Sequence, residues 1–119
     1  MPVLFLSTDL VFSSRLAAAG ERLNVLVISV SSFDAAIARL RQGSIALVIL
    51  DLSAAILDPH DAVLRLREVQ PELAVIAYAP HVHEGRLSAA ENAGCNEVLT
   101  RGQFDRQMEA LLLRYAVKS

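Results

Sequence analysis

The fold of this chain is decided by residues 45–51, which read Ile45-Ala46-Leu47-Val48-Ile49-Leu50-Asp51. The first six are apolar, a run too short to span a membrane and too uniformly apolar for a strand with one solvent-facing side. Such a run is typical of a central parallel strand covered by helices on both faces. Open parallel sheets bind their ligands beyond the carboxyl ends of their strands, where Asp51 would lie. Asp51 is therefore the first candidate functional residue.

Four further apolar segments alternate with segments of helical periodicity. The predicted strands are Val3–Leu6, Asn24–Val30, Ile45–Asp51, Leu73–Ala79 and Glu97–Thr100. Alternation of strands and helices predicts βαβ units around one parallel sheet. Because no linker, low-complexity segment or internal repeat interrupts the alternation, residues 1–119 are expected to form a single domain.

The intervening segments carry helix signals. Gly20 is expected to end the first helix, Ser31 and Asp34 have the spacing of a capping box, and Asp58-Pro59 predicts an N-cap followed by proline. The segment at about 84–93 is the weakest helix, being mostly Ala, Ser and charged residues. The predicted apolar face of the first helix is Phe12, Leu16 and Ala19, and that of the second is Phe33, Ala36, Ile37 and Leu40. The predicted apolar face of the last helix is Phe104, Met108, Leu111, Leu112 and Tyr115.

The composition excludes several classes of protein. Hydrophobic residues make up 54% of the chain and charged residues 20%, which excludes a disordered protein. The net charge of −2, without a basic tail or stripe, gives no basis for binding nucleic acid or anionic lipid. No apolar run approaches the roughly 20 residues of a membrane span, and no signal peptide precedes the first strand. With a single cysteine, which excludes an internal disulfide, a cytoplasmic location is expected.

Two stretches carry a resemblance to a known family. Residues 47–52 read Leu-Val-Ile-Leu-Asp-Leu, and residues 93–101 read Ala-Gly-Cys-Asn-Glu-Val-Leu-Thr-Arg. The first resembles the segment that carries the phosphoacceptor aspartate in receiver domains of two-component response regulators. The second is similar to that family's Ala-Gly-Ala-Asp-Asp-Tyr-Leu-Thr-Lys stretch. The resemblance covers nearly the whole chain and implies a flavodoxin-like α/β fold, with five parallel strands in the order 2-1-3-4-5 and five helices.

The resemblance also implies a phosphorylation pocket, of which Asp51 is the candidate phosphoacceptor. In the family, two adjacent acidic residues after the first strand help to hold Mg²⁺. The matching residues here are Ser7 and Thr8, and the first carboxylate, Asp9, comes one place later. Ser7 and Thr8 bring no charge, and Asp9 is expected to cap or begin the first helix.

Three other positions depart from the family pattern. The hydroxyl residue that ends the fourth strand and grips the phosphoryl group corresponds to Ala79. The lysine that ends the fifth strand, usually followed by a cis-proline, corresponds to Arg101-Gly102. The aromatic residue that changes rotamer on activation corresponds to Val98. The chain is therefore interpreted as a degenerate receiver, or pseudo-receiver, that needs no cofactor and binds Mg²⁺ weakly or not at all.

Two readings stay open for Asp51 and for Arg101. Asp51 is either a residual phosphoacceptor or a structural carboxylate that pairs with Arg101 or caps a nearby amide. Arg101 is either a standing counterion to Asp51 or a ligand for phosphate. A further hypothesis is that an Asp51–Arg101 pair locks the domain in one conformation, and an Asp51→Ala chain with unchanged stability and partner binding would count against it.

Other reactive side chains have simpler interpretations. His81 and His83 lie in the loop after the fourth strand, and with His60 they lack the spacing of a zinc site, so solvated histidines are expected. Cys95 is expected to be a small buried hydrophobe rather than a redox residue. Tyr78 is expected in the core, with the crevice as the alternative.

Three functions follow from this pattern. The first is a signalling module that works through protein–protein contact. The second is a slow or unconventional phosphoacceptor, modified at Asp51 by a histidine kinase or phosphotransfer protein in a phosphorelay. The third is a small-ligand sensor that uses the crevice around Ser7, Thr8, Tyr78 and Ala79. An enzyme is not expected, since no nucleophile elbow, Gly-rich phosphate loop or dinucleotide fingerprint is present.

The resemblance also implies a partner surface. In the family, the fourth helix, fifth strand and fifth helix contact partner proteins or form a homodimer. In this chain that surface would include the segment at about 84–93, Gln103 and the outer side of the last helix. Leu113 lies opposite the predicted apolar face of that helix and is the candidate interface residue.

Overall fold

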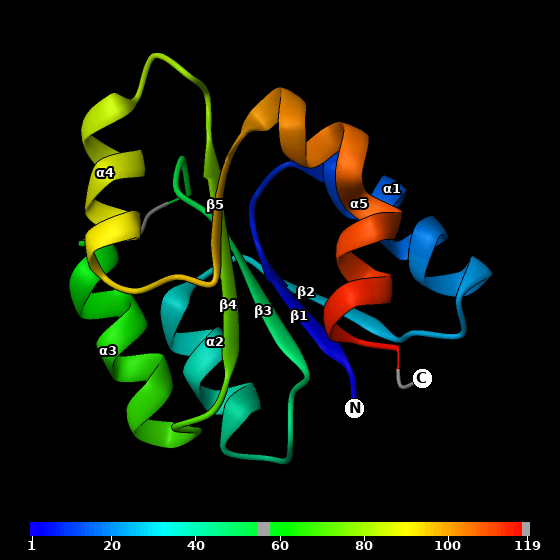
Figure 1. The fold of residues 1–119 in the computed structure, drawn as a ribbon. Helices are drawn as coiled ribbons and strands as arrows, with labels where there is room; N and C mark the ends of the chain where they lie inside the picture. Colours follow the sequence, from blue (N-terminus) through cyan, green and yellow to red (C-terminus); the bar gives the residue numbers. More distant parts are fainter. Residues whose placement is uncertain (55–57, 118–119) are drawn as a thin grey trace.

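The computed structural model describes residues 1–54 and 58–117. Its strands form one parallel sheet in the order β2-β1-β3-β4-β5 (Figure 1). The strands are β1 (Val3–Leu6), β2 (Val27–Val30), β3 (Leu47–Asp51), β4 (Ala74–Ala79) and β5 (Glu97–Thr100). The predicted α/β fold class and strand order are confirmed.

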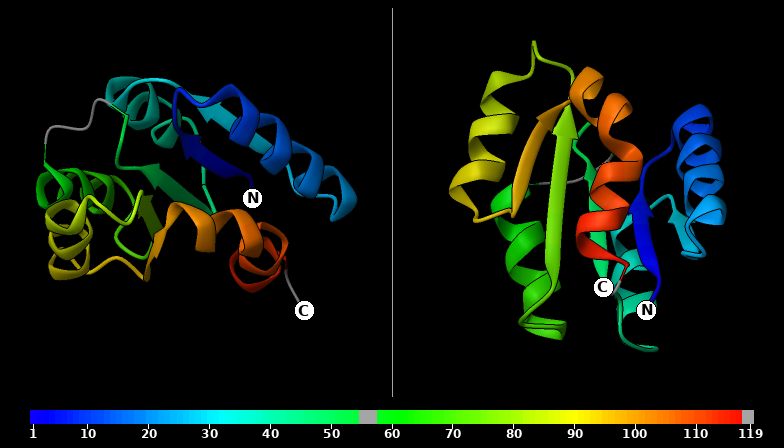
Figure 2. Two further views of the ribbon diagram at one scale, coloured as in Figure 1. Left: turned by 90° about the horizontal axis from the view of Figure 1, so that it is seen from above. Right: turned by 45° about the vertical axis from the view of Figure 1, so that its right-hand side comes forward.

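Helices cover both faces of the sheet. They are α1 (Leu10–Arg22), α2 (Phe33–Leu40), α3 (Pro59–Val69), α4 (Glu84–Asn92) and α5 (Arg101–Tyr115). Figures 1 and 2 show α1 and α5 on one face and α2, α3 and α4 on the other. Two separate apolar clusters fill the layers between the sheet and these two sets of helices. None of the helices in the described ranges is both long and apolar enough to cross a bilayer.

The central strand is buried along its whole length. Each residue of β3 is shielded on both faces, from Leu47 at 0% exposure to Asp51 at 6%. β1 and β4 pair with β3 on its two sides. The continuous apolar run in the sequence therefore reflects a strand that packs against helices above and below it.

Three predicted strands begin later than expected, while β1 and β5 match. Asn24 has a positive φ of 57° and lies in the turn after α1, so β2 starts at Val27. Ile45 is buried but lies outside the sheet ladder, and β3 starts at Leu47. β4 likewise starts at Ala74 rather than Leu73. Just before β3 and β4, the apolar side chains of Ile45 and Leu73 are buried outside the hydrogen-bonded ladder, and this is why hydropathy overestimates the length of these two strands.

The prediction that Gly20 ends the first helix is wrong. α1 continues to Arg22, and Gly20 is buried inside it. A Cβ atom at position 20 would lie 2.5 Å from the carbonyl oxygen of Val25 and 2.8 Å from a methyl of Val27. Gly20 is required because the chain returns across the helix at this point.

The capping box predicted from Ser31 and Asp34 is also wrong. Ser32 is the N-cap of α2, and its hydroxyl accepts a hydrogen bond from the Ala35 N–H at 3.1 Å. The capping by Asp58, followed by Pro59, is confirmed at the start of α3. Sequence spacing identified the right segment for α2 but placed its first residue one position early.

The remaining helix predictions agree with the structure. α4 buries only Ala90, consistent with its weak apolar pattern. In α5, most of the predicted face is buried, and Tyr115 is half-buried. Leu113 is 51% exposed, as its position opposite that face predicts.

Candidate functional site

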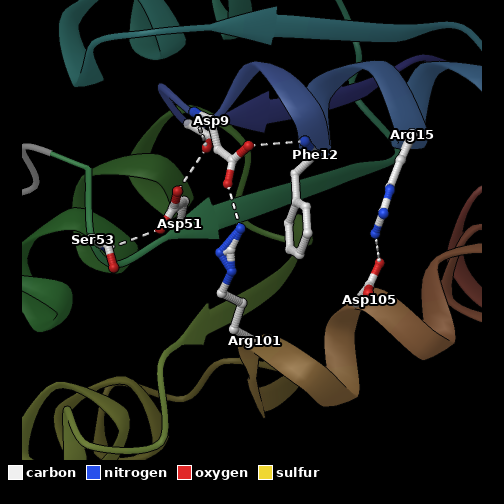
Figure 3. Close-up of polar contacts among 8 residues, drawn as sticks. Asp9, Phe12, Arg15, Asp51, Ser53, Arg101 and Asp105 are labelled. Carbon is white, nitrogen blue, oxygen red and sulfur yellow. Dashed lines mark hydrogen bonds and ion pairs between the residues drawn. The ribbon is translucent and has the colours of Figure 1, made fainter.

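Asp51 lies at the carboxyl end of β3 and is held by two hydrogen bonds. Its Oδ2 accepts a hydrogen bond from the Ser7 hydroxyl at 2.6 Å. Its Oδ1 accepts one from the Ser53 backbone N–H at 2.9 Å (Figure 3). The predicted capping of a nearby amide by Asp51 is therefore confirmed. Ser53 was missed by the sequence analysis, although an aspartate that bonds an amide two residues ahead is a common turn signal.

Ser7 joins Asp51 to the start of α1. Ser7 directly follows β1 and is 4% exposed. Its hydroxyl donates to Asp51 and accepts from the Asp9 N–H at 3.0 Å. The neighbouring Thr8 is exposed. Of the two residues at the positions of the family's acidic pair, Ser7 thus already has its hydroxyl committed to two neighbours.

Arg101 pairs with Asp9 and not with Asp51, so the expected Asp51–Arg101 pair is wrong. A guanidinium nitrogen of Arg101 lies 2.7 Å from Asp9 Oδ2 (Figure 3). Asp9 Oδ1 accepts the Phe12 N–H at 3.0 Å, which confirms Asp9 as the N-cap of α1. The Arg101 guanidinium also lies 4.2 Å from the centroid of the Phe12 ring.

The reason for this pairing is geometric. Arg101 is the first residue of α5, and Asp9 immediately precedes α1, which lies beside α5 on the same face of the sheet. The Phe12 ring provides a surface on which the guanidinium stacks, and a cation over an aromatic ring is a favourable arrangement. Carboxylate and ring together direct Arg101 toward α1.

Tyr78 and Ala79 end β4 and face opposite sides of the sheet. Ala79 is fully buried among the residues beneath α2, α3 and α4. Tyr78 is 2% exposed and belongs to the cluster beneath α1 and α5, so its predicted core position is confirmed. Its ring stacks on that of Phe104 at a centroid distance of 4.2 Å.

The Tyr78 hydroxyl occupies an unusual position. Among the buried side-chain polar atoms in the described parts of the chain, it alone has no hydrogen-bond partner within 3.5 Å, although hydrogen-bonding interactions with the Ser7 and Asp51 side chains contribute to its pKa. Tyr78 is paired with Asp51 in the register between β3 and β4. Burial, followed by the negative charge of Asp51, raises the pKa of Tyr78 far above its ordinary value, so the phenol stays protonated.

A cavity of about 240 Å³ opens above these residues. It is lined by Thr8, Asp9, Asp51, Ser53, Tyr78, Pro80 and Arg101. Ser7 and Ala79, which the sequence analysis placed in this crevice, do not line it. The Ser7 hydroxyl is engaged in its hydrogen bonds with Asp51 and the Asp9 N–H, and Ala79 packs on the opposite face of the sheet.

A second polar contact near Asp51 was also missed. Arg86 of α4 donates a hydrogen bond to the Leu52 carbonyl oxygen at 2.9 Å. It thereby connects α4 to the chain directly after Asp51. Nothing in the local sequence indicates this contact, because Arg86 and Leu52 come together only through the packing of α4 beside β4.

The other candidate residues lie outside this site. His60, His81 and His83 are exposed, as expected. Cys95 is half-buried rather than fully buried and precedes β5 by two residues, and burial raises the pKa of its thiol to about 11. Val98 is half-buried and packs against the cluster beneath α2, α3 and α4.

Gln103 has a structural role that was not predicted. Its side chain accepts the Thr100 N–H at 2.8 Å, and the Thr100 hydroxyl accepts the Gln103 N–H at 3.2 Å. This capping box begins α5 directly after β5. The Thr-x-x-Gln spacing in the sequence was the signal that could have found it. Gln103 remains exposed, as the proposed interface requires.

No protein-family model matches the sequence, and the comparison with curated proteins finds no match. Solved structures do match. One is the receiver domain of the sensor histidine kinase PA1611 from Pseudomonas aeruginosa, described with a magnesium ion coordinated in its active-site cleft. It aligns with a TM-score of 0.79 at 18% sequence identity, over 96% of this chain and 95% of that one. The receiver domain of NtrX from Brucella abortus aligns with a TM-score of 0.79 at 17% identity over 94% and 95%.

HP1043, an orphan response regulator of Helicobacter pylori, aligns with a TM-score of 0.78 at 15% identity over 96% of this chain and 92% of that one. Identities this low establish similarity of fold rather than of chemistry. The chain has the fold of a response-regulator receiver domain.

Proposed function

We propose that this chain is an atypical receiver domain that acts in signal transduction through protein–protein contact, without Mg²⁺-dependent phosphorylation of Asp51. The proposal rests on one observation above all. Asp9 is the carboxylate that comes closest in sequence to the positions of the family's acidic pair. Both of its oxygens are engaged, one by Arg101 and the other by the Phe12 N–H. Asp9 therefore does not replace the acidic pair that receivers use to hold the metal.

The groups around Asp51 fit Mg²⁺ poorly. Mg²⁺ prefers carboxylates and waters in strict octahedral geometry. Here Asp51 is accompanied by the neutral hydroxyls of Ser7 and Thr8, and that of Ser7 already bridges Asp51 and the Asp9 N–H. Within residues 1–54 and 58–117, no three His, Cys, Asp or Glu side chains are grouped in a way that could hold a metal ion.

The groups that would respond to a phosphoryl group also differ from those of the family. Catalysis of phosphoryl transfer relies on positioning and on neutralisation of charge. Arg101 is directed toward Asp9, and Ala79 offers a buried methyl in place of a hydroxyl. A phosphorylation switch also needs a two-state element that reads the modified residue. Val98 provides no aromatic ring for that role.

An amide NMR titration tests the proposal. We expect no saturable shifts at Ser7, Asp9 and Asp51 on addition of Mg²⁺, or of Mg²⁺ with beryllofluoride, a mimic of the aspartyl phosphoryl group. Saturable shifts at these residues that extend to β5 and α5 would overturn the proposal. They would favour the alternative of a slow phosphoacceptor that receives its phosphoryl group from a histidine kinase.

We further propose that the α4–β5–α5 surface contacts a signalling protein or a second copy of the chain. Leu113 is 51% exposed on the outer side of α5 and would lie in that contact. Sedimentation equilibrium tests the homodimer. Leu113→Glu is expected to weaken association, whereas Leu64→Glu, at an equally exposed position on α3, is expected to leave it unchanged. Equal association of both variants and the parent chain would exclude this surface.

A further inference from the structure

α4 is the helix of this fold with the least apolar anchoring. Of its nine residues only Ala90 is buried, whereas the eight-residue α2 buries three apolar side chains. His83 precedes α4 without capping it through its side chain, and Gly85 in the first turn is a weak helix former. Packing and local capping therefore stabilise the N-terminal half of α4 only weakly.

One polar contact joins this half of α4 to the body of the domain. Arg86 donates a hydrogen bond at 2.9 Å to the carbonyl oxygen of Leu52, a fully buried residue. Among the described residues, no other group donates to this carbonyl oxygen. Hydrogen bonds from a charged donor are stronger than those between neutral groups, and a buried acceptor left without a donor is costly. Loss of the Arg86 guanidinium is therefore expected to release the start of α4.

The carbonyl oxygen that Arg86 contacts lies in the turn directly after Asp51. Asp51 Oδ1 accepts the Ser53 N–H at 2.9 Å. The backbone oxygen of Asp51 accepts the Ala54 N–H at 3.0 Å. These two hydrogen bonds enclose Leu52, so the direction of its carbonyl group depends on Asp51. Arg86 thus connects α4 to a turn whose conformation is set by the candidate phosphoacceptor.

We propose that the hydrogen bond from Arg86 to the Leu52 carbonyl oxygen couples the turn after Asp51 to the docking of α4. The two states are the docked start of α4 and its local opening. The receiver pattern makes its connection through a hydroxyl residue and an aromatic residue, where this chain has Ala79 and Val98. A contact from α4 itself needs neither of them. The inference rests on the proposed function, because α4 belongs to the surface proposed to contact a partner.

Amide hydrogen exchange of the whole chain measures the opening of α4. Arg86→Met removes the guanidinium and keeps an aliphatic side chain, and the fold is expected to persist because Arg86 is exposed. We expect the amides of residues 87–90 to exchange about tenfold faster, from the loss of one charged hydrogen bond, while those of β1 and β3 are unchanged.

The matched control for this measurement is Arg65→Met. Arg65 is an exposed arginine of α3 whose guanidinium lies 4.9 Å from the centroid of the Phe33 ring. Its removal is expected to leave exchange in α4 as in the parent chain. Unchanged exchange of residues 87–90 in Arg86→Met, or an equal acceleration throughout the sheet, would overturn the proposal.

A double-mutant cycle tests the coupling itself. Asp51→Ala removes the acceptor of the Ser53 N–H and is expected to shift the amide resonances of α4 in the parent chain. In the Arg86→Met chain the same substitution is expected to leave those resonances unchanged, because the connection is already lost. Equal shifts in both chains, or none in the parent, would overturn the proposal. If Asp51→Ala does not fold, the exchange of Arg86→Met decides.

Failure of the proposed function is distinguishable from failure of this inference. Saturable shifts with Mg²⁺ and beryllofluoride would contradict the proposed function, and faster exchange of α4 in Arg86→Met would still support the coupling. The reverse result, no response to beryllofluoride and unchanged exchange in Arg86→Met, would leave the proposed function standing and overturn the coupling.

Discussion

Arg101 and Asp9, which are 92 residues apart in the sequence, form an ion pair at 2.7 Å, and this pair leaves Asp51 without the arginine. The pair joins the N-terminal ends of α1 and α5. Two further ion pairs, Arg15 with Asp105 and Arg22 with Glu109, link the same two helices along their length. Arg101, which lines the cavity beside Asp51, thus belongs to a set of ion pairs between α1 and α5.

The first prediction separates the two roles of Asp9. Asp9→Asn keeps an oxygen for the Phe12 N–H but removes the charge opposite Arg101. Because the pair is partly exposed, the expected loss in the free energy of unfolding is below about 1 kcal/mol. Asp9→Ala also removes the helix cap and is expected to cost about 1–2 kcal/mol. Urea denaturation measures both, and equal losses would show that the cap contributes nothing.

The second prediction concerns the Ser7 hydroxyl. Ser7→Ala removes a donor from Asp51 and an acceptor from the Asp9 N–H, in a residue that is 4% exposed. Leaving buried polar groups unpaired is expected to cost about 1–3 kcal/mol. Ser14→Ala, an exposed substitution in α1, is the matched control and is expected to be neutral or slightly stabilising. A Ser7→Ala chain as stable as the control in thermal unfolding would contradict the bridging role.

The third prediction compares two helical glycines. At Gly20 a Cβ would lie 2.5 Å from the Val25 carbonyl oxygen, whereas at Gly85 it would have no neighbour within 4 Å. Gly20→Ala is expected to destabilise the chain by about 1–3 kcal/mol through overpacking, despite the better helix propensity of alanine. Gly85→Ala is expected to stabilise it by about 0.4–1 kcal/mol. Denaturation curves of the two variants with the same sign would refute this difference.

The fourth prediction concerns the reactivity of Cys95. Burial, partly opposed by the positive charge of Arg67, raises the pKa of the thiol to about 11. Because the thiolate is the reactive form, alkylation of the folded chain by iodoacetamide at neutral pH is expected to be slow. The rate is expected to increase as the pH rises toward this pKa, as long as the fold persists. Mass spectrometry measures the rate, and a rate equal to that of the urea-unfolded chain would contradict the prediction.

Much of the fold could be predicted because it depends on local patterns. The apolar run that ends at Asp51, the period-3.6 faces of α1, α2 and α5, and the Asp58-Pro59 start of α3 are each written within a few consecutive residues. Chirality and the short connections then leave few ways to assemble alternating strands and helices. The position of Asp51 at the carboxyl edge of the sheet follows from the same reasoning.

Local patterns in the sequence thus determined the parallel sheet with helices on both faces and the place of Asp51 at its carboxyl edge. The strand order and the residues expected around the crevice came from the resemblance to receiver domains. Only the tertiary structure decided which of them pair. Arg101 bonds Asp9 because α1 and α5 lie side by side, and Tyr78 lies beside Asp51 because the register between β3 and β4 pairs these two residues. These outcomes depend on distances between residues far apart in the chain, which local propensity and periodicity do not encode.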